Sequence, residues 1–346
     1  MVLHGSRRTG GEPGDGAVRR DGSAAAGHDA HDAGSLPPAG SRHDALVYDT
    51  ADDVAAAAAP WLLEGLEAGD AAVIATGPGT AGPLWEAVGR DPRVVVVERH
   101  RLYRSRTPTA ITAFRRFAEQ HAASGRLVRC VGEVDFGATP ADWREWQAYE
   151  SVINDAFAPL PLWGLCVFSS ALPDPLLTSA LHTHPGVVTP DGRAANPDYV
   201  DPAAYLRALP VPDEPLEATA PALADDDITD YAGLRHAVRA HLDSVDGPAD
   251  VLEDFLMAVD EMTSNAVRHG SPPAGLRLWT APGRLVATVR DSGRGLDDPF
   301  AGYGPAHGED LSHGGMGLWL ARQLCDHVAI RRDDAGTSVR LSTSWT

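Results

Sequence analysis

The alternation of short apolar runs with helical stretches between residues 45 and 170 constrains the fold of this chain more than any other feature of its sequence. Runs typical of buried strands lie at Ala45–Tyr48, Ala71–Thr76, Val94–Val97, Leu127–Val131 and Leu165–Ser169. Helical stretches separate them, at Asp52–Glu67, Pro108–Ser124 and Ala141–Phe157. Such alternation is typical of a parallel sheet covered by helices on both faces. We therefore expect a doubly wound α/β domain over residues 41–210.

Two stretches of unusual composition flank this domain. Residues 1–40 are rich in Gly, Ala, Asp, Arg and His and contain almost no large apolar side chain. Burial cannot offset the entropy of ordering such a stretch, so we expect a disordered tail. Residues 211–230 hold seven acidic residues, three prolines and no basic residue. This composition predicts an extended, self-repelling linker at residues 211–227.

Residues 228–346 are expected to form a second domain with a different order of elements. Two helices come first, and a third follows at Met316–His327. Strands are predicted at Leu276–Thr280, Arg284–Arg290, Val328–Arg332 and Ser338–Ser342. This order favours helices gathered on one face of a mixed sheet, which is an α/β sandwich.

The composition excludes several classes of function. The 48 acidic and 29 basic residues give a formal net charge of -19, which argues against capture of nucleic acid or an anionic membrane and favours protein or small-molecule partners. All 29 basic residues are arginine, so lysine-dependent sites are excluded. Cys130, Cys166 and Cys325 are far apart and lack the short spacings of a zinc site, which fits a reduced compartment. With no apolar run of about 18–20 residues and no signal-peptide core, the chain is expected to be cytoplasmic.

A group of polar residues lies on one face of a predicted helix at Pro248–His269. Glu261, Asn265 and His269 follow one another at intervals of four, away from the apolar stripe of that helix. The amide oxygen of Asn265 suits magnesium, and the carboxylate of Glu261 can polarise an attacking hydroxyl or water. The same three residues would also fit a solvated polar face.

Three glycine-containing segments follow this helix. Arg290–Gly295 comes directly after a predicted strand, where its aspartate can accept the amino group of adenine and its glycines let the base approach the backbone. His313–Leu318 opens a helix whose free amides and dipole suit phosphates. Gly336–Ser338 precedes the last strand. Each segment alone would fit an ordinary turn, but their common order after the polar helix indicates a nucleotide site.

Together these segments resemble the GHKL superfamily of gyrase, Hsp90, histidine kinases and mismatch-repair ATPases. Within it, Ala258–Gly270 is similar almost throughout to the first box of the anti-sigma-factor serine kinases. The resemblance implies a GHKL (Bergerat) α/β sandwich that binds ATP and Mg2+, with magnesium on Asn265, Glu261 as catalytic base and adenine on Asp291. The resemblance also implies a short lid at about Pro299–Gly314. It further implies contacts with the nucleotide or its lid for Arg268, His269, Gly293, Gly295, Gly315, Gly317 and Thr337.

Members of that branch phosphorylate a serine on an anti-anti-sigma partner and sequester a sigma factor. The resemblance therefore implies a signal-responsive serine/threonine protein kinase, in which Arg268 or Arg294 stabilises the transferring phosphoryl group. It also implies a STAS-type anti-anti-sigma factor and a sigma factor as partners, and a homodimer formed through the ATP domain. Two alternatives stay open: a histidine kinase lacking its own dimerisation module, and a module that holds ATP without catalysis. His236 superficially resembles a phosphoacceptor, but no dimerising two-helix hairpin precedes the ATP domain.

The N-terminal domain resembles a sensory domain. The run His43–Val188 is similar to the MEDS domain of methanogen and methylotroph regulators, a RecA-like fold without nucleotide chemistry. The residues that carry the likeness are His43, Trp146, Tyr149, Glu150, Cys166, His184 and Pro185. The resemblance implies a sensor of an unknown small molecule. Cys166 with His43, His182 and His184 would form a ligand, metal or redox site if the fold brings them together, although scattered Cys and His residues are more often structural.

Gly77–Leu84 leads from a predicted strand into a helix and has the two outer glycines of a phosphate loop. Pro83 and Leu84 stand where such a loop requires Lys and Ser or Thr, so nucleoside triphosphate binding is not expected there. A degenerate phosphate loop and an ordinary glycine-rich turn both fit this segment.

Overall fold

The computed structural model describes residues 40–99, 103, 106–122, 125–295, 297–304 and 316–346. Except for Gly40, the predicted tail lies outside this part of the chain. Residues 39–346 form one compact unit, which contains two sheets.

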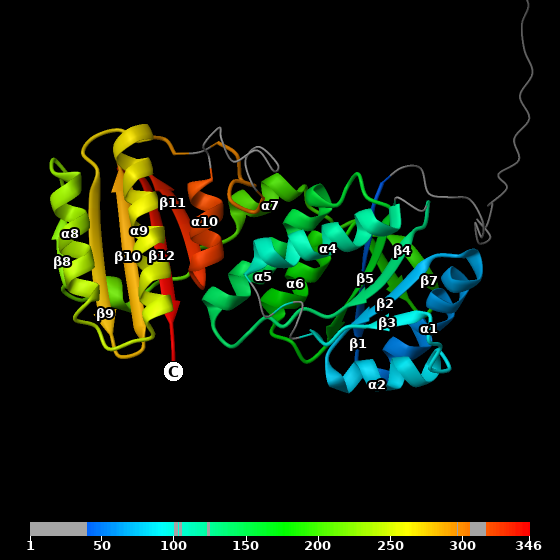
Figure 1. Ribbon diagram of the computed structural model, residues 1–346. Coiled ribbons are helices and arrows are strands. Elements are labelled where there is room, and N and C mark those ends of the chain that lie inside the picture. Colours follow the sequence, from blue (N-terminus) through cyan, green and yellow to red (C-terminus); the bar gives the residue numbers. More distant parts are fainter. Residues whose placement is uncertain (1–39, 100–102, 104–105, 123–124, 296, 305–315) are drawn as a thin grey trace, which may run out of the picture. The chain divides into compact units, whose positions relative to one another are not determined.

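The N-terminal sheet has seven strands in the order β3-β2-β4-β5-β1-β6-β7 (Figure 1). They are β1 (Arg42–Tyr48), β2 (Ala71–Ala75), β3 (Val94–Val96), β4 (Val128–Gly132), β5 (Leu162–Ser169), β6 (Gly186–Thr189) and β7 (Gly192–Ala195). Every neighbouring pair is parallel except β6 with β7, which form an antiparallel hairpin. The predicted parallel sheet is therefore confirmed.

Helices cover both faces of this sheet. They are α1 (Ala51–Ala68), α2 (Pro78–Ala87), α4 (Thr107–Ala122), α5 (Pro140–Ala156), α6 (Asp174–Thr183) and α7 (Pro202–Ala208). Successive side chains of a strand point to opposite faces: Leu46 packs in the core formed with α1 and α2, whereas its neighbour Ala45 packs in the core formed with α4, α5 and α6. The doubly wound α/β fold is confirmed.

Local sequence signals determine where two of these helices begin. The hydroxyl of Thr50 accepts a hydrogen bond from the backbone of Asp53, and the carboxylate of Asp53 accepts one from the backbone of Thr50, which forms a capping box at α1. Thr139 and Asp142 form the same box at α5. Because the cap sets the first residue of α5, it also sets which residues of that helix face the sheet.

The C-terminal sheet has five strands in the order β11-β12-β10-β9-β8. The elements are 3-10 helix η1 (Pro215–Ala218), β8 (Leu223–Asp225), α8 (Tyr231–Leu242), α9 (Ala249–His269), β9 (Gly275–Ala281), β10 (Arg284–Asp291), α10 (Gly317–Leu324), β11 (His327–Asp333) and β12 (Gly336–Ser344). Alternate residues of β10, namely Leu285, Ala287 and Val289, pack in one core with α8, α9 and α10. The α/β sandwich is confirmed, with one correction: all four strand pairs are antiparallel, so the sheet is not mixed.

The acidic segment predicted as a linker differs from that prediction, because it packs on the sheet face opposite the helices. Its Glu217 accepts hydrogen bonds from the Thr288 hydroxyl at 2.6 Å and the Arg340 guanidinium at 2.9 Å. The indole of Trp279 donates to the carbonyl of Thr219 at 3.1 Å, and β8 adds a strand to the sheet. The composition of this segment predicts that its acidic side chains repel one another when the segment is considered alone. In the folded chain, arginines from distant strands neutralise these side chains.

Helix α5 of the N-terminal domain contacts α10 and β11 of the C-terminal domain. The carboxylate of Glu145 accepts hydrogen bonds from the Arg322 guanidinium and from the backbone N–H of Val328, each at 3.3 Å. Asp142, in the first turn of α5, lies 2.8 Å from the imidazole of His327. Arg322 and Glu145 are both buried, so this ion pair is shielded from water.

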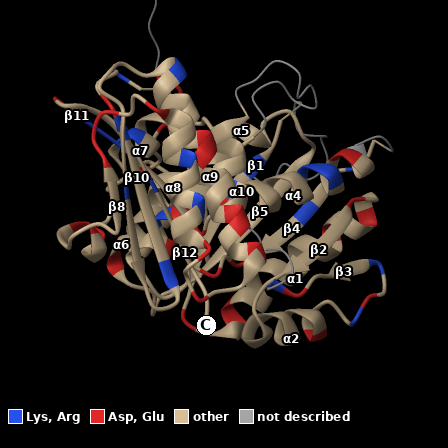
Figure 2. Cartoon of the chain, turned by 60° about the vertical axis from the view of Figure 1, so that its left-hand side comes forward, with Lys and Arg blue, Asp and Glu red and all other residues tan. Residues whose placement is uncertain are grey.

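Acidic and basic residues are interspersed over the helices of both domains (Figure 2). Among the described helices, none combines the length and the apolar character that crossing a bilayer requires.

Candidate functional site

Glu261 and Asn265 lie next to the start of α10. Both are half-buried on the polar side of α9, whose apolar side buries Val259 and Met262. Gly317, the first residue of α10, faces them: a Cβ at this position would lie 2.6 Å from the Asn265 amide nitrogen and 3.0 Å from a Glu261 carboxylate oxygen. A larger residue at this position would therefore displace the ends of the Asn265 and Glu261 side chains.

Met316, which precedes α10, offers no side-chain hydrogen bond to the first amides of the helix. A helix start carries backbone donors and the positive end of the helix dipole, which suit an anion. Gly315 and most of the predicted lid lie outside the described residues.

Asp291 ends strand β10 and is held by two backbone groups. Its Oδ1 accepts hydrogen bonds from the amides of Gly293 at 2.7 Å and Ser271 at 3.2 Å. Gly270, just after α9, packs against the same side chain, since a Cβ there would lie 2.5 Å from the Asp291 Cγ. Among the described residues, nothing donates to its Oδ2, so this oxygen can accept a hydrogen bond from a ligand.

Thr337 on β12 lies beside Asp291. It pairs with Asp291 across the sheet, and its buried hydroxyl donates to the carbonyl of Gly293 at 2.9 Å. Gly295 has a positive φ of 67° and packs on Thr337, whose hydroxyl oxygen would lie 2.6 Å from a Cβ at that position. The structure thus brings the second and fourth predicted segments together at one end of the sheet.

Three further predicted residues lie at the surface. Arg268 and His269, in the last turn of α9, and Arg294, in the turn after β10, have exposed side chains. These side chains face solvent, where an incoming anionic group can meet them.

The predicted sensory residues form a separate buried cluster in the N-terminal domain. His43 Nε2 lies 3.2 Å from the Cys166 sulfur, and the rings of His43 and His184 are 3.8 Å apart. Glu150 belongs to the same cluster, with carboxylate oxygens 3.3 Å from His43 and 3.4 Å from His184. The fourth predicted member, His182, does not belong to this group of converging ligand atoms.

Sequence reasoning did not assign a site role to Glu150, although this residue carried part of the MEDS likeness. A glutamate on the sheet-facing side of α5, among buried residues such as Tyr149 and Val152, is the signal that could have found it. Burial lowers the pKa of His184 well below its usual value, and His43 adds to this effect. Burial also raises the pKa of the Cys166 thiol well above its usual value, with the Glu150 carboxylate adding to it.

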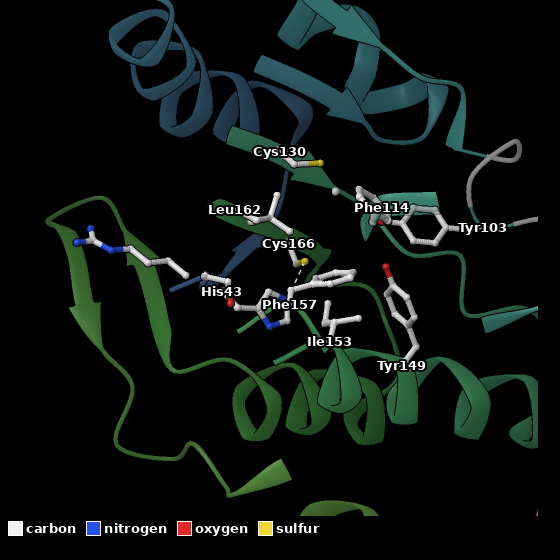
Figure 3. Close-up of a pocket in the computed structure, with 13 residues that line it drawn as sticks. His43, Tyr103, Phe114, Cys130, Tyr149, Ile153, Phe157, Leu162 and Cys166 are labelled. Carbon is white, nitrogen blue, oxygen red and sulfur yellow. Dashed lines mark hydrogen bonds between the residues drawn. The ribbon is translucent and has the colours of Figure 1, made fainter. Parts of the chain in front are cut away.

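A cavity of about 30 Å³ lies beside this cluster. Figure 3 shows the side chains of His43 and Cys166 pointing toward one another, with the Tyr103 and Tyr149 hydroxyl groups on the far side of the cavity. Cys130, on the neighbouring strand β4, also lines it. The cluster is therefore next to a small, mainly apolar space.

The loop that resembles a phosphate loop binds a carboxylate of the protein itself. Glu133 Oε2 accepts hydrogen bonds from the Gly77 amide and the Thr80 hydroxyl, both at 2.7 Å. Its other oxygen accepts one from Tyr48 at 3.0 Å and lies 3.6 Å from Arg99. A fixed negative charge stands where a phosphate would bind, which agrees with the absence of the loop's lysine.

Two family models match the chain. The MEDS model, for the methanogen/methylotroph DcmR sensory domain, matches residues 42–185. The model of the histidine kinase-like ATPase domain matches residues 224–343. Both resemblances stated from the sequence are confirmed.

Similar proteins include the serine-protein kinase RsbW of Bacillus subtilis, 32% identical over 104 residues, which are 27% of this chain and 64% of that protein. RsbW of Bacillus licheniformis is 35% identical over 99 residues, 25% of this chain and 62% of that protein. The chain thus spans less than two thirds of these Bacillus relatives. RsbW of Halalkalibacterium halodurans is 31% identical over 130 residues, 35% of this chain and 77% of that protein.

A solved structure of the RsbU and RsbW domains of a Mycobacterium tuberculosis protein matches with a TM-score of 0.26 and 20% identity. The match covers 36% of this chain and 32% of that one. On the strength of the relative matched over 77% of its length at 31% identity, the chain belongs to the family of RsbW serine-protein kinases, with a MEDS sensory domain preceding its ATPase domain.

Proposed function

We propose that the protein is an ATP-dependent serine/threonine protein kinase of the anti-sigma type whose activity responds to a signal received by the MEDS domain. The observation that carries this proposal is the convergence of Asn265, Glu261 and Gly317 at the start of α10, in a domain that also positions Asp291 and Thr337. This convergence supports the presence of a nucleotide site, and family membership supports the transfer reaction.

The donor set fits ATP with magnesium. The Asn265 amide oxygen would hold the ion, which neutralises charge on the transferring phosphoryl group when bound. Asp291, held by two backbone amides through one oxygen, would accept the adenine amino group with the other. The phosphate chain would bind at the start of α10, beside Asn265 and Glu261.

In the transfer step, Glu261 would accept the proton of the attacking serine hydroxyl, since its carboxylate lies beside Gly317 at the start of α10. Arg268 and Arg294, both exposed, would approach the phosphoryl oxygens and stabilise the charge that develops on them. His269, one turn beyond Asn265, would contact the nucleotide from the end of α9.

The protein partners follow from kinship with the anti-sigma kinases. We propose a STAS-type anti-anti-sigma factor as the phosphorylated substrate and a sigma factor as the sequestered partner, with a homodimer formed through the ATPase domain in the cytoplasm. The buried pair of Glu145 and Arg322 gives the sensory domain a direct contact with α10, so a change in the MEDS domain would reach the helix that bears Gly317.

The test uses the full-length chain to capture its partner and then supplies labelled ATP. Glu261→Gln should retain ATP binding and lose transfer, whereas Asn265→Ala should lose both. Glu253→Gln is the matched control, because Glu253 lies on α9 but forms only an exposed ion pair with Arg239, and it should behave as wild type.

The chemistry of the labelled product separates the candidate functions. Acid-stable phosphate on the captured partner supports the serine/threonine kinase, and acid-labile phosphate contradicts it in favour of a histidine kinase. If Glu261→Gln leaves regulation of the partner intact while Asn265→Ala abolishes it, the domain acts by binding ATP alone and the proposed catalysis is wrong.

A further inference from the structure

We propose that His43, Glu150, Cys166 and His184 bind one divalent transition-metal ion of the zinc class inside the N-terminal domain. Each residue offers one ligand atom, and the four atoms lie within 4.8 Å of one another. All four residues are buried. This site is separate from the nucleotide site, and the proposal does not depend on kinase activity.

The spacing of the ligand atoms fits tetrahedral coordination. Zinc bonds of about 2.0–2.3 Å to nitrogen, oxygen and sulfur place neighbouring ligands roughly 3.3–3.8 Å apart. The observed separations from His43 Nε2 are 3.2 Å to sulfur and 3.3 Å to a Glu150 oxygen. That oxygen lies 3.4 Å from His184 Nε2. Small outward shifts would therefore admit an ion.

Hydrogen bonds fix the orientation of His43. The side-chain nitrogen of Asn154 donates to three backbone carbonyls, those of Glu150, Ser151 and Thr183. The Asn154 side-chain oxygen is therefore the atom that faces His43 Nδ1, at 3.1 Å. Since this oxygen only accepts, His43 Nδ1 carries the hydrogen and Nε2 presents a lone pair to the cluster.

His184 has the same arrangement. Its Nδ1 lies 2.7 Å from the carbonyl oxygen of Ala180, so Nδ1 is the donor. Its Nε2 is buried and has no hydrogen-bond partner among the residues that the structure describes. Metal-bound histidines typically donate their second nitrogen to a carbonyl or side-chain oxygen in this way, which fixes the ring for coordination.

Glu150 provides the strongest sign that a cation is needed. Its side chain is 1% exposed, and among the described residues neither carboxylate oxygen accepts a hydrogen bond from a nitrogen or hydroxyl donor. With both imidazoles presenting lone pairs, the Cys166 thiol is the hydrogen donor of this cluster, and a thiol is a weak donor. A buried carboxylate with so weak a donor is costly, and a bound cation would satisfy it together with the two imidazoles.

The ligand types select the class of ion. Magnesium and calcium prefer oxygen ligands, whereas imidazole and thiolate suit zinc and related transition metals. A thiolate and a carboxylate carry two negative charges, so a divalent ion makes the buried site neutral overall. The four ligands come from β1, α5, β5 and the end of α6, so the ion would cross-link the sheet to the helices on one of its faces.

The experiment uses the full-length protein without nucleotide, stripped by a chelator and then titrated with Zn2+ or Co2+. We expect one equivalent of metal per chain and a higher unfolding temperature with zinc. The cobalt form should show a thiolate-to-cobalt charge-transfer band that Cys166→Ser removes. Glu150→Gln should weaken zinc binding by at least roughly 10–100-fold, the loss typical when a residue that only supports a metal ligand is changed.

Matched controls are available in the same domain. Cys130→Ser changes a buried cysteine that lines the same cavity, and His182→Ala changes a histidine outside the cluster; both should bind metal as wild type does. X-ray absorption on the zinc-loaded wild type should show one sulfur at about 2.3 Å and two imidazoles at about 2.0 Å.

Three results would overturn the proposal. They are a folded wild type that takes up no stoichiometric zinc, a Cys166→Ser variant that keeps the cobalt–thiolate band, and an absorption spectrum without sulfur. The spectrum of the wild type decides the question even if a ligand variant fails to fold.

Discussion

Gly317 at the start of α10 lies in direct contact with Asn265 on α9, so closely that a Cβ would be 2.6 Å from the amide nitrogen. The contact joins the helix that would hold the metal ion to the helix start that would hold phosphates. Because α10 also carries Arg322, which pairs with Glu145 of the sensory domain, the position of α10 is tied to both domains.

Gly317→Ala should therefore weaken ATP binding without unfolding the domain. The added methyl group meets the ends of the Asn265 and Glu261 side chains, which would have to turn away from the positions proposed for the metal ligand and the base. We expect roughly tenfold weaker binding, which corresponds to about 1.4 kcal/mol. Calorimetric titration of the full-length protein with ATP and magnesium measures this. Gly82→Ala on α2 is the control, because among the described residues a Cβ there meets nothing within 4 Å. Equal affinity of Gly317→Ala and wild type would mean that α10 does not approach Asn265 in the nucleotide-bound state.

Glu217→Ala should destabilise the C-terminal domain, although this residue lies in a segment with the composition of a linker. The change leaves the buried Thr288 hydroxyl and the mostly buried Arg340 without their carboxylate partner. Leaving such groups unsatisfied costs about 1–3 kcal/mol, and denaturant unfolding followed by tryptophan fluorescence measures the loss.

Asp226→Ala provides the comparison for Glu217→Ala. Asp226 also pairs with an arginine, Arg277, but both side chains are largely exposed, and such pairs contribute roughly 0.2–1 kcal/mol. If Glu217→Ala and Asp226→Ala lower the free energy of unfolding by the same small amount, residues 211–222 do not cover the sheet in solution.

The doubly wound fold could be predicted because its signals are local. Strands β1 to β5 each contain a short apolar run, and α1 and α5 begin at capping boxes, such as Thr50 with Asp53. When strands and helices alternate along the chain, few sheet topologies are compatible with their order. The prediction of a mixed C-terminal sheet was wrong because strand direction depends on which distant strands pair, as in β10 with β12, and periodicity within one strand carries no such information.

The acidic segment and Glu150 were harder to predict for the same physical reason. The charges that neutralise Glu217 come from Arg340, more than a hundred residues away along the chain, so local composition indicated repulsion. Glu150 becomes a candidate ligand only when β1 and β5 pair and bring His43 beside Cys166. By contrast, the segments around Asp291 and Thr337 carry short motifs of their own, so they could be assigned before the strand pairing that joins them was known.

The buried pair of Arg322 and Glu145 should couple the stability of the two domains. Removing one partner, as in Glu145→Gln, leaves the other charge buried and should cost about 3–5 kcal/mol. The double variant with Arg322→Met should lose less stability than the sum of the two single losses, because it removes both charges of this pair. The same cycle on the exposed pair of Arg239 and Glu253 should show a coupling of only about 0.2–1 kcal/mol. Additive losses at Arg322 and Glu145 would show that the pair does not form in solution.

Tyr231 should make the C-terminal domain sensitive to alkaline pH. Its hydroxyl donates a hydrogen bond to the Asp260 carboxylate at 2.6 Å. Burial raises the pKa of Tyr231 to about 12, and the Asp260 carboxylate contributes to this rise. In the unfolded chain a tyrosine ionises near pH ~10. The folded state therefore holds this proton more tightly, and the resulting stability is complete below about pH 10 and is lost as the pH rises toward about 12.

Denaturant unfolding at about pH 9 and about pH 11 checks this expectation, on either side of the unfolded pKa. Other buried tyrosines add to the alkaline loss of the wild type, so the informative quantity is the difference between the wild type and Tyr231→Phe. Tyr231→Phe should lose less stability than the wild type over this interval, because phenylalanine has no proton to release. Asp260→Asn should give an intermediate loss, since it removes the neighbouring charge and keeps the burial of the ring. An alkaline loss in Tyr231→Phe equal to that of the wild type would mean that the hydrogen bond to Asp260 does not hold the Tyr231 proton.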